Sequence, residues 1–297
     1  MKRTMLVATH IVLAFVLLFG TPTTAQAAVL LTVNPSKAPG VYYTDGSLAV
    51  ALTSYPGSFI VYTTNGTTPV AKVNLYKQLI ITNGIRYTGT LYLASTKTVK
   101  AIAVLNWYTP ASSVVTLTYE LYRPTALGNA VQTKFSGFNY NSYSSTQTFT
   151  ALNGRTGSFT KALSWGGINC TWYTYVRIRY NLGRAIVFSV NTPLNGKDWY
   201  AVVASSSKQV KYGGSGALEA LVKANGNRPV YNIMVSFPHN NGGPYGHVML
   251  IDAIINGKVY YSDSFAPGIL KIKNSLSEFK AAYATSNGAI VGVVHLK

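Results

Sequence analysis

Short apolar runs separated by turn residues dominate the first part of the chain. Residues 48–52, 59–62 and 98–104 are rich in aliphatic, β-branched and aromatic side chains. Turn pairs that contain glycine stand between such runs, namely Pro39-Gly40, Asp45-Gly46, Pro56-Gly57 and Asn65-Gly66. Strands at regular spacing with turns of this kind are typical of an all-β sandwich. The pattern therefore predicts a β-sandwich domain over residues 28–123, with its last strand at 114–119.

The second part of the chain has a different hydrophobic period. Residues 170–181 fit a helix that Gly183 ends, and residues 197–204 fit a second helix. Strand-like runs follow at 230–237, 247–255, 258–262 and 289–295. Helices first and closely connected strands afterwards predict an α+β domain with an antiparallel sheet over residues 160–297. Residues 124–159 are rich in serine, threonine, asparagine and tyrosine, and we expect a linker and a domain edge there.

Residues 1–27 have the features of a secretory signal peptide. Lys2 and Arg3 make a basic start, an apolar segment covers residues 5–19, and Ala-Gln-Ala at 25–27 fits a cleavage site. The longest uninterrupted apolar run has 9 residues, whereas a membrane-spanning helix needs about 20. We therefore expect cleavage after residue 27, a secreted or wall-associated protein, and no stable membrane insertion.

The net charge narrows the choice of partners. The chain has 25 basic and 7 acidic residues, which gives +18, and +16 remains once Lys2 and Arg3 are removed. A field of one sign and this size implies a polyanionic partner. For an exported protein, which we expect to be a monomer, an anionic cell-wall polymer or a phospholipid surface fits better than nucleic acid. The chain shows no aromatic–basic motif for nucleic-acid recognition.

The remaining titratable residues exclude two common classes of site. The 7 aspartates and glutamates form no close pair, which disfavours a glycosidase that works with two carboxylates. No HExxH or CxxC spacing occurs, so we expect neither a zinc site nor an organic cofactor.

One cysteine and one histidine stand where a nucleophile and a base are expected. Cys170, the only cysteine, follows two glycines and begins the predicted helix. A helix N-terminus offers unpaired N–H groups and a positive dipole, and both favour the nucleophilic thiolate. His247 begins a predicted strand after the glycine-rich loop 240–246. A helix-borne cysteine followed by a strand-borne histidine is the papain-like order, although a free cysteine is also often a buried, inert residue.

Three short motifs surround these residues: Asn-Cys-Thr-Trp-Tyr at 169–173, Asn-Gly-Lys-Asp-Trp at 195–199 and Tyr-Gly-His-Val at 245–248. Together they resemble the CHAP domain (cysteine, histidine-dependent amidohydrolase/peptidase) over residues 160–297. The resemblance implies a papain-like fold and a bacterial hydrolase that cleaves peptidoglycan, as an N-acetylmuramoyl-L-alanine amidase or an endopeptidase. It also implies that Cys170 is the nucleophile and His247 the general base, and that no cofactor is needed.

The third catalytic residue depends on the register of a hairpin. The family often has an acidic residue on the strand after the histidine and an asparagine two residues later, and here these positions hold Asp263 and Phe265. An ideal two-residue turn would place Ser264, and not Asp263, on the face of His247. A three-residue loop with a glycine bulge at 255–257 would bring Asp263 to that face. Asp263 as orienting residue therefore predicts a bulged hairpin, with Ser264 as the alternative.

Further residues are candidates for the oxyanion site and for the substrate groove. The backbone N–H of Cys170 is one oxyanion donor, and Asn169, where the family commonly has glutamine, is the second candidate. The candidates for the substrate groove are aromatic residues, and the alternative for each is a role in the hydrophobic core. They are Trp165, Trp172, Trp199 and Tyr245.

The N-terminal region resembles a different family. Residues 39–42, 60–69 and 113–119 are similar to the chitobiase/β-hexosaminidase C-terminal domain, a small immunoglobulin-like module. The resemblance implies an accessory module, either a spacer or a surface binder.

Two functions therefore compete. The first is a secreted peptidoglycan hydrolase that forms a thioester on Cys170. The second is a non-catalytic binding protein of the cell wall or surface with a degenerate CHAP domain, which the unusual residues Asn169 and Phe265 motivate.

Overall fold

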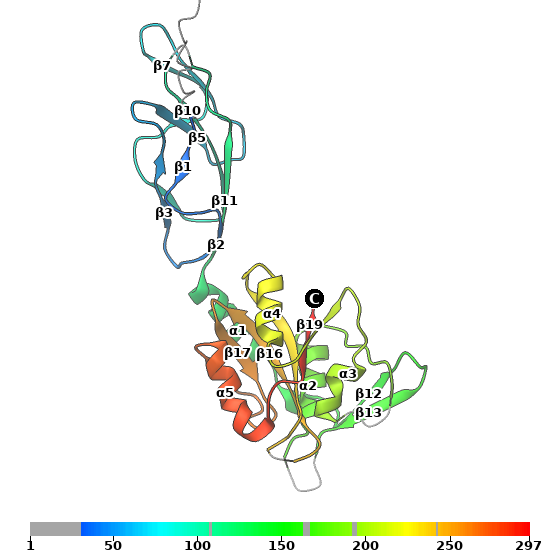
Figure 1. The fold of residues 1–297 in the computed structure, drawn as a ribbon. Coiled ribbons are helices and arrows are strands. Elements are labelled where there is room, and N and C mark those ends of the chain that lie inside the picture. Colours follow the sequence, from blue (N-terminus) through cyan, green and yellow to red (C-terminus); the bar gives the residue numbers. More distant parts are fainter. Residues whose placement is uncertain (1–30, 107–108, 163–166, 192–194, 242) are drawn as a thin grey trace, which may run out of the picture.

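The computed structural model describes residues 31–106, 109–162, 167–191, 195–241 and 243–297. The predicted signal peptide and Trp165 lie outside these residues. Figure 1 shows an elongated β-rich region followed by a rounder body of helices around a sheet. Among the described residues, no helix is both long enough and apolar enough to cross a membrane.

The N-terminal region is β-rich, as its apolar runs and turns predict. Its largest sheet has five strands in the order β2 (Gly40–Tyr43), β11 (Val115–Tyr122), β10 (Lys97–Val104), β5 (Phe59–Thr63) and β8 (Ile85–Arg86). The pair β2–β11 is parallel, and the other pairs of this sheet are antiparallel. Three two-stranded sheets complete the region: β1 (Asn34–Pro35) with β4 (Leu52–Thr53), β3 (Leu48–Val50) with β9 (Leu91–Leu93), and β6 (Val70–Val73) with β7 (Leu79–Asn83).

The C-terminal part is built on a six-stranded sheet. Its order is β14 (Gln209–Gly213), β19 (Gly292–Leu296), β15 (Val230–Phe237), β16 (His247–Ile255), β17 (Lys258–Ser262) and β18 (Leu270–Lys273). All neighbouring strands are antiparallel, as the sequence predicts.

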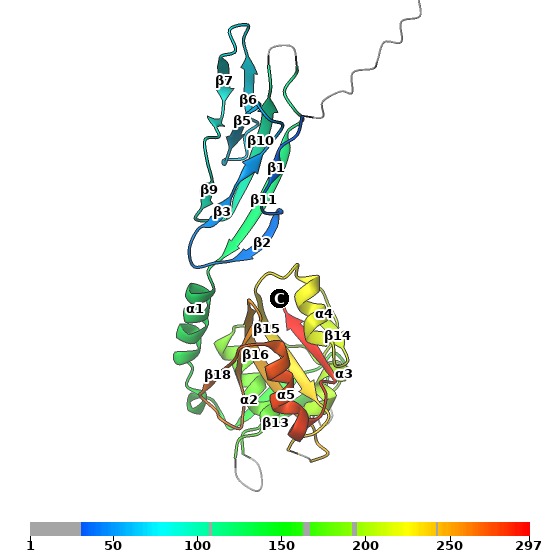
Figure 2. The same cartoon turned by 60° about the vertical axis from the view of Figure 1, so that its left-hand side comes forward.

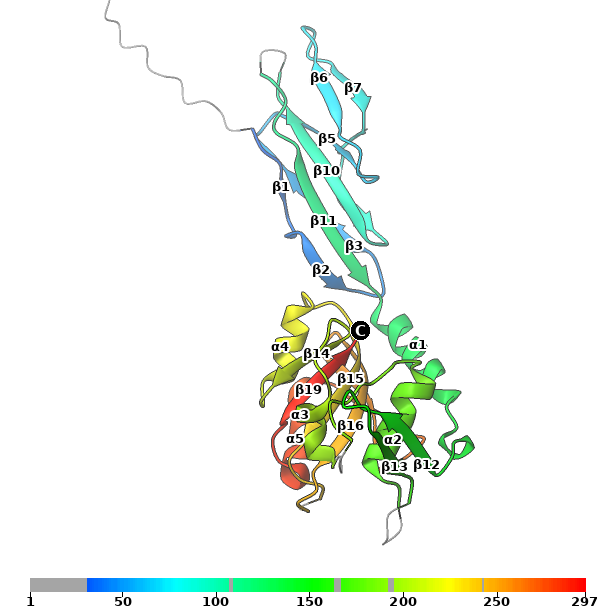
Figure 3. The ribbon, with the colours of Figure 1, turned by 90° about the vertical axis from the view of Figure 1, so that its right-hand side faces the viewer.

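Two layers cover this sheet, and Figure 3 shows the sheet between them. One layer holds α2 (Cys170–Val176), its π-helical extension η2 (Arg177–Asn181), the short segments η1 (Tyr140–Ser142), η3 (Gly196–Asp198) and α3 (Trp199–Val202), and the hairpin β12 (Thr146–Thr150)–β13 (Thr156–Thr160). The other holds α4 (Ala217–Ala224) and α5 (Leu276–Asn287). Strand residues alternate between the two layers, since Val248 and Leu250 belong to the first core and Met249 and Ile251 to the second. The predicted helix at 170–181 is therefore present, while the one at 197–204 is limited to η3 and α3.

Residues 124–136, for which the sequence predicted a linker and domain edge, form the helix α1 (Pro124–Ser136). Proline is favoured at the first helical position, where Pro124 stands. Leu127, Val131 and Phe135 follow at intervals of four residues and so share one helix face. Val131 packs in a cluster with Leu127 and with residues of the hairpin β16–β17. The many polar residues of the segment 124–159 made this apolar stripe difficult to recognise in the sequence.

Helix α1 is also the joint between the two parts (Figure 2). The Asp45 carboxylate, in the turn after β2, accepts hydrogen bonds from the Thr125 backbone N–H at 3.1 Å and its hydroxyl at 2.7 Å. An acidic side chain at a helix N-terminus satisfies donors that the helix itself leaves free. Arg228 adds an ion pair to Glu120 across the same joint at 2.5 Å.

Candidate active site

Cys170 is the first residue of α2, where its position is set by a cap. Asn169 has an extended backbone, and its Oδ1 accepts hydrogen bonds from the Thr171 N–H at 3.0 Å and the Thr171 hydroxyl at 2.7 Å. Asparagine is among the preferred residues at this position because its side chain replaces a missing helical acceptor. Cys170 is 7% exposed. The cap fixes where the helix begins and therefore where the sulfur lies.

The backbone at His247 packs closely against the segment 195–199, and two glycines make this close approach possible. A Cβ atom on Gly196 would lie 2.5 Å from the carbonyl carbon of His247. A side chain on Gly246, whose φ is +70°, would overlap Lys197. The motifs at 195–199 and 245–248 are thus in direct contact, and each contains glycine because a larger residue would separate them.

The imidazole of His247 is paired with Asp263 in the interior. His247 Nε2 lies 3.0 Å from Asp263 Oδ1, and both side chains are at most 1% exposed. Asp263 Oδ1 also accepts from the Phe265 N–H at 3.2 Å, and Oδ2 accepts from the Tyr283 hydroxyl at 2.7 Å. The carboxylate is therefore held on both oxygens, and it holds one nitrogen of the ring.

The other ring nitrogen is free of hydrogen bonds within the described part of the chain. His247 Nδ1 is buried and has no hydrogen-bond partner among the described residues. Burial lowers the pKa of His247, but the hydrogen bond to Asp263, the charge of that carboxylate and the neighbouring Cys170 outweigh burial and raise it to about 10. Burial raises the pKa of Asp263, and the hydrogen bonds from His247 and Tyr283 reverse this and leave the pKa below its usual value. His247 is thus an imidazolium paired with the Asp263 carboxylate at neutral pH.

Aromatic rings enclose the imidazole. Phe265 is stacked on it with ring centroids 4.9 Å apart and planes 18° apart, and Tyr283 is nearly parallel at 6.5 Å. Phe265 stands where the family often has asparagine, and it is 50% exposed. A ring in this place keeps water from the His247–Asp263 pair, which strengthens the electrostatic part of the hydrogen bond.

The bulge that was predicted to accompany Asp263 is present, but at a different position. The hairpin β16–β17 turns tightly at Asn256 and Gly257, both with positive φ, and Ile255 pairs with Lys258, so the expected three-residue loop is corrected to a two-residue turn. The register shifts further along, between Ile251 and Ala253.

The displaced bulge has the predicted effect on the two candidate orienting residues. Beyond it, Leu250 pairs with Ser262, so Asp263 follows on the face of His247. Ser264 is buried, and among the described hydrogen bonds none joins it to His247.

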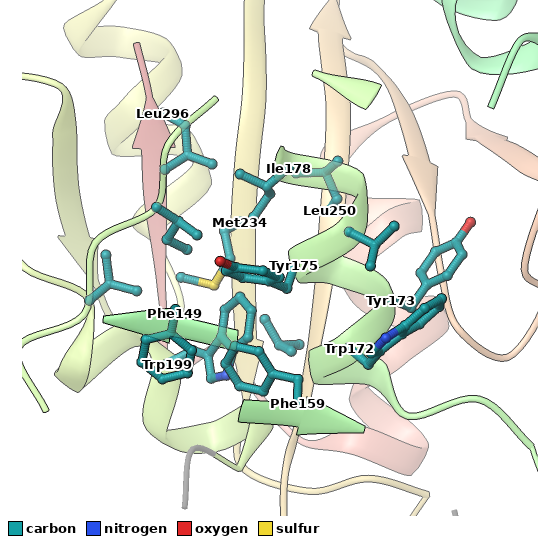
Figure 4. Close-up of a cluster of buried hydrophobic side chains, with 14 of the residues drawn as sticks. Phe149, Phe159, Trp172, Tyr173, Tyr175, Ile178, Trp199, Met234, Leu250 and Leu296 are labelled. Carbon is teal, nitrogen blue, oxygen red and sulfur yellow. The ribbon is translucent and has the colours of Figure 1, made fainter. Parts of the chain in front are cut away.

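The aromatic groove candidates divide into core and surface. Trp172 and Trp199 are fully buried, and Figure 4 shows Trp199 packed with Phe149 and Phe159 in the core below α2. Both tryptophans therefore take the core role that the sequence left open. Tyr245 is 67% exposed and lies two residues before His247.

Sequence reasoning did not single out Tyr283, Arg177 or Asp252. Tyr283 belongs to the buried stripe Phe279, Tyr283, Asn287 of α5, in which a tyrosine with a buried hydroxyl needs a partner. Arg177 follows Cys170 by two helical turns on a helix whose residues are all buried. A buried arginine at that spacing is a signal of a buried anion, because such a charge is costly unless it is paired.

Comparisons with known proteins support the CHAP resemblance of the C-terminal part. Residues 158–264 match the family model of the CHAP domain, and residues 50–119 match that of the Fn3-associated module. No curated protein and no solved structure matches the chain. The chitobiase-type resemblance of the N-terminal region remains a prediction. The residues that match the CHAP domain include Cys170, His247 and Asp263, and this family is generally hydrolytic, which suggests a peptidoglycan hydrolase in general.

Proposed function

We propose that the protein is a secreted peptidoglycan hydrolase that cleaves amide bonds through a thioester on Cys170. The observation that carries this proposal is the buried His247–Asp263 pair, with the Cys170 sulfur acting on the same imidazole. A thiolate, a histidine and a group that orients the histidine are the parts that cysteine hydrolases share. The helix α2 packed on an antiparallel sheet supports the papain-like interpretation of the fold.

The proposal gives each residue a role. The Cys170 thiolate attacks the amide carbonyl carbon, and the imidazolium of His247 gives its proton to the leaving nitrogen, so that the amine leaves and a thioester remains. Water then attacks the thioester while His247 takes its proton, which releases the acid and the free thiolate. Asp263 keeps the ring oriented and stabilises its charged form.

Two groups are candidate donors for the oxyanion. The Cys170 N–H is at the first position of α2, where a helix supplies no acceptor of its own. The Asn169 amide is held in one plane because its Oδ1 caps the helix. The same cap orients its Nδ2, which makes the amide a candidate second donor despite being shorter than glutamine.

The positive charge supports a wall polymer as the partner. The +16 net charge that remains without residues 1–27 favours anionic polymers, and such attraction between exposed charges weakens as salt screens it. Wall binding and activity should therefore both fall across an ionic-strength series. A flat series would remove the electrostatic part of the proposal and leave the chemistry untouched.

The second candidate is a wall-binding protein without activity. The 7% exposure of Cys170 and the Phe265 ring over His247 favour it, because both restrict the approach of a substrate. It predicts that a Cys170→Ala variant differs from the wild type in no assay of binding or clearing.

The experiment that separates the two is clearing of purified cell walls by the wild type and by Cys170→Ala, with released amines and reducing ends counted. Clearing by the wild type alone, with new amines and no new reducing ends, supports the hydrolase, and fragment masses then distinguish amidase from endopeptidase. If neither protein clears walls and both sediment with them, the hydrolase is refuted and the binder remains.

A further inference from the structure

The strand that begins with His247 changes its facing residues halfway along. Val248 and Leu250 pack in the core below α2, whereas Ala253 and Ile255 pack against α1 on that same side of the sheet. A regular strand would continue the even-numbered positions on this side. The change occurs at Asp252, which is the extra residue of the bulge between Ile251 and Ala253.

Asp252 is held by a residue of the nucleophile's own helix. Its carboxylate forms an ion pair with Arg177, whose side chain is fully buried. Arg177 Nε also donates to the Ser262 hydroxyl at 3.1 Å, on the strand β17 across from the bulge. The guanidinium therefore touches both strands of the hairpin at the place where their register shifts.

The environment of Arg177 leaves it little freedom. Its guanidinium lies 4.6 Å from the ring centroid of Phe135 and 4.9 Å from that of Phe138, and it also donates to the Asn181 side chain. A planar guanidinium stacked on aromatic rings keeps its hydrogen-bond fork in one direction. Arg177 is thus a rigid connection between α2 and the bulge.

A row of polar residues on one face of α2, called the polar seam here, connects Arg177 to the catalytic cysteine. Cys170, Thr174 and Arg177 are spaced by four and three residues and so share one face of the helix. Thr174 donates its hydroxyl to the Val248 carbonyl at 3.1 Å. The polar seam therefore contacts the hairpin at two places. One is the His247 end, where Cys170 helps to raise the pKa of the imidazole, and the other is Asp252.

We propose that Arg177 and Asp252 are positioning residues, which hold the bulge and thereby set the register that brings Asp263 to His247. This inference rests on the proposed function of the same site. If the bulge relaxed into a regular ladder, Asp263 would move to the opposite face and Ser264 would replace it, because a shift of one residue reverses the side of each side chain. A buried ion pair is weak as a source of stability, and specifying one geometry is its better supported use.

The test compares Arg177→Met, Asp252→Asn and the conservative Arg177→Lys with a control, Glu219→Gln. The control breaks the Lys280–Glu219 ion pair, whose atoms are 2.7 Å apart and which joins the helices α5 and α4 without contacting the bulge. Two readouts need no wall substrate: the His247 imidazole titration by NMR and the rate of Cys170 alkylation by iodoacetamide against pH. The third readout is kcat and KM for wall cleavage.

The inference predicts one pattern in all three readouts. In Arg177→Met and Asp252→Asn the His247 titration moves towards that of an unpaired histidine, the alkylation profile shifts with it, and kcat falls roughly 100-fold with KM little changed. Arg177→Lys recovers part of each effect, and Glu219→Gln resembles the wild type.

Other outcomes are equally decisive. Folded variants with the wild-type titration and alkylation profile would show that the ion pair only supports the fold and would overturn the inference. If Arg177→Met fails to fold, Asp252→Asn and Arg177→Lys decide by the same criteria. A wild type that never clears walls, combined with shifted titrations in the variants, would refute the proposed function and leave the positioning role standing.

Discussion

The β-rich region and the CHAP domain bury polar groups to very different extents. Among the described residues of the β-rich region, the only buried polar side chain is Thr63, and the core there is aliphatic and aromatic. The CHAP domain and the segment after it bury Arg177, His247, Asp252 and Asp263. Burying a charge is costly unless it is paired and hydrogen-bonded.

The difference in buried polar groups indicates which part of the chain carries the chemistry. A core such as that of the β-rich region is sufficient for folding, because apolar burial supplies most of the driving force. The buried charges of the second part are paired with one another, and their pairs lie at the start and in the middle of the same strand, β16. Four changes, from the largest expected effect to the smallest, test whether these charges carry function.

The largest effect is expected for Asp263→Ala. It leaves the imidazole without its orienting carboxylate, and we expect kcat to fall roughly 100-fold or more while KM changes little. Asp263→Asn, which keeps a hydrogen-bond acceptor, should retain more activity. Ser264→Ala is the matched control, because Ser264 is the next residue in the chain and its side chain is also buried. A larger loss in Ser264→Ala than in Asp263→Ala would assign the orienting role to Ser264.

The second effect is a pH dependence of stability that only the CHAP domain should show. The pKa of His247 is raised from 6.5 to about 10, so the folded state binds this proton more tightly than the unfolded state. The stabilisation is complete below pH 6.5 and is lost as pH rises to about 10, with a slope of about 1.4 kcal/mol per pH unit. Denaturant unfolding of wild type and His247→Gln across this range measures the difference.

At acid pH the stability changes in the opposite direction, because the group concerned is Asp263. The pKa of Asp263 lies below 3.8, so its contribution to stability is present above that pH and is lost as pH falls through the folded pKa. A difference between wild type and His247→Gln that stayed constant from pH 6.5 to 10 would contradict the raised pKa of His247.

A smaller effect is expected for Tyr283→Phe. Its hydroxyl helps to lower the pKa of Asp263, so its removal should move acid unfolding to higher pH. We expect kcat to fall about tenfold, since one hydrogen bond to a charged group contributes about 1.5 to 3 kcal/mol. Tyr92→Phe, at an exposed position of the β-rich region, is the control and should change neither quantity. Equal behaviour of both variants would show that Tyr283 serves only to fill the core.

The smallest effect is expected at the joint between the two parts. Glu120→Gln breaks the exposed ion pair with Arg228, and such pairs contribute little because solvent screens them. Wall cleavage and the unfolding midpoint should equal those of the wild type. A loss of activity here would show that the orientation of the β-rich region matters to the CHAP domain.

Much of the fold and part of the candidate site could be predicted from local patterns. Alternating apolar residues and glycine turns indicated the strands, and the helix at Cys170 followed from helical spacing and from Gly183 as its end. These signals are local, because a side chain within a turn or a pleat faces a direction that its neighbours in sequence determine. Helix α1 was missed because polar composition outweighed the apolar stripe of Leu127, Val131 and Phe135.

The residues and their order along the chain were enough to predict Cys170, His247 and the CHAP resemblance. The partner of the histidine was not, because Asp263 and Ser264 differ only by a one-residue register. Tertiary structure decided that register through the bulge at Asp252, which a buried arginine holds from another element. It also brought Tyr283 to Asp263 and Phe265 over the ring. Such contacts follow from the packing of segments distant in sequence, and no local period encodes them.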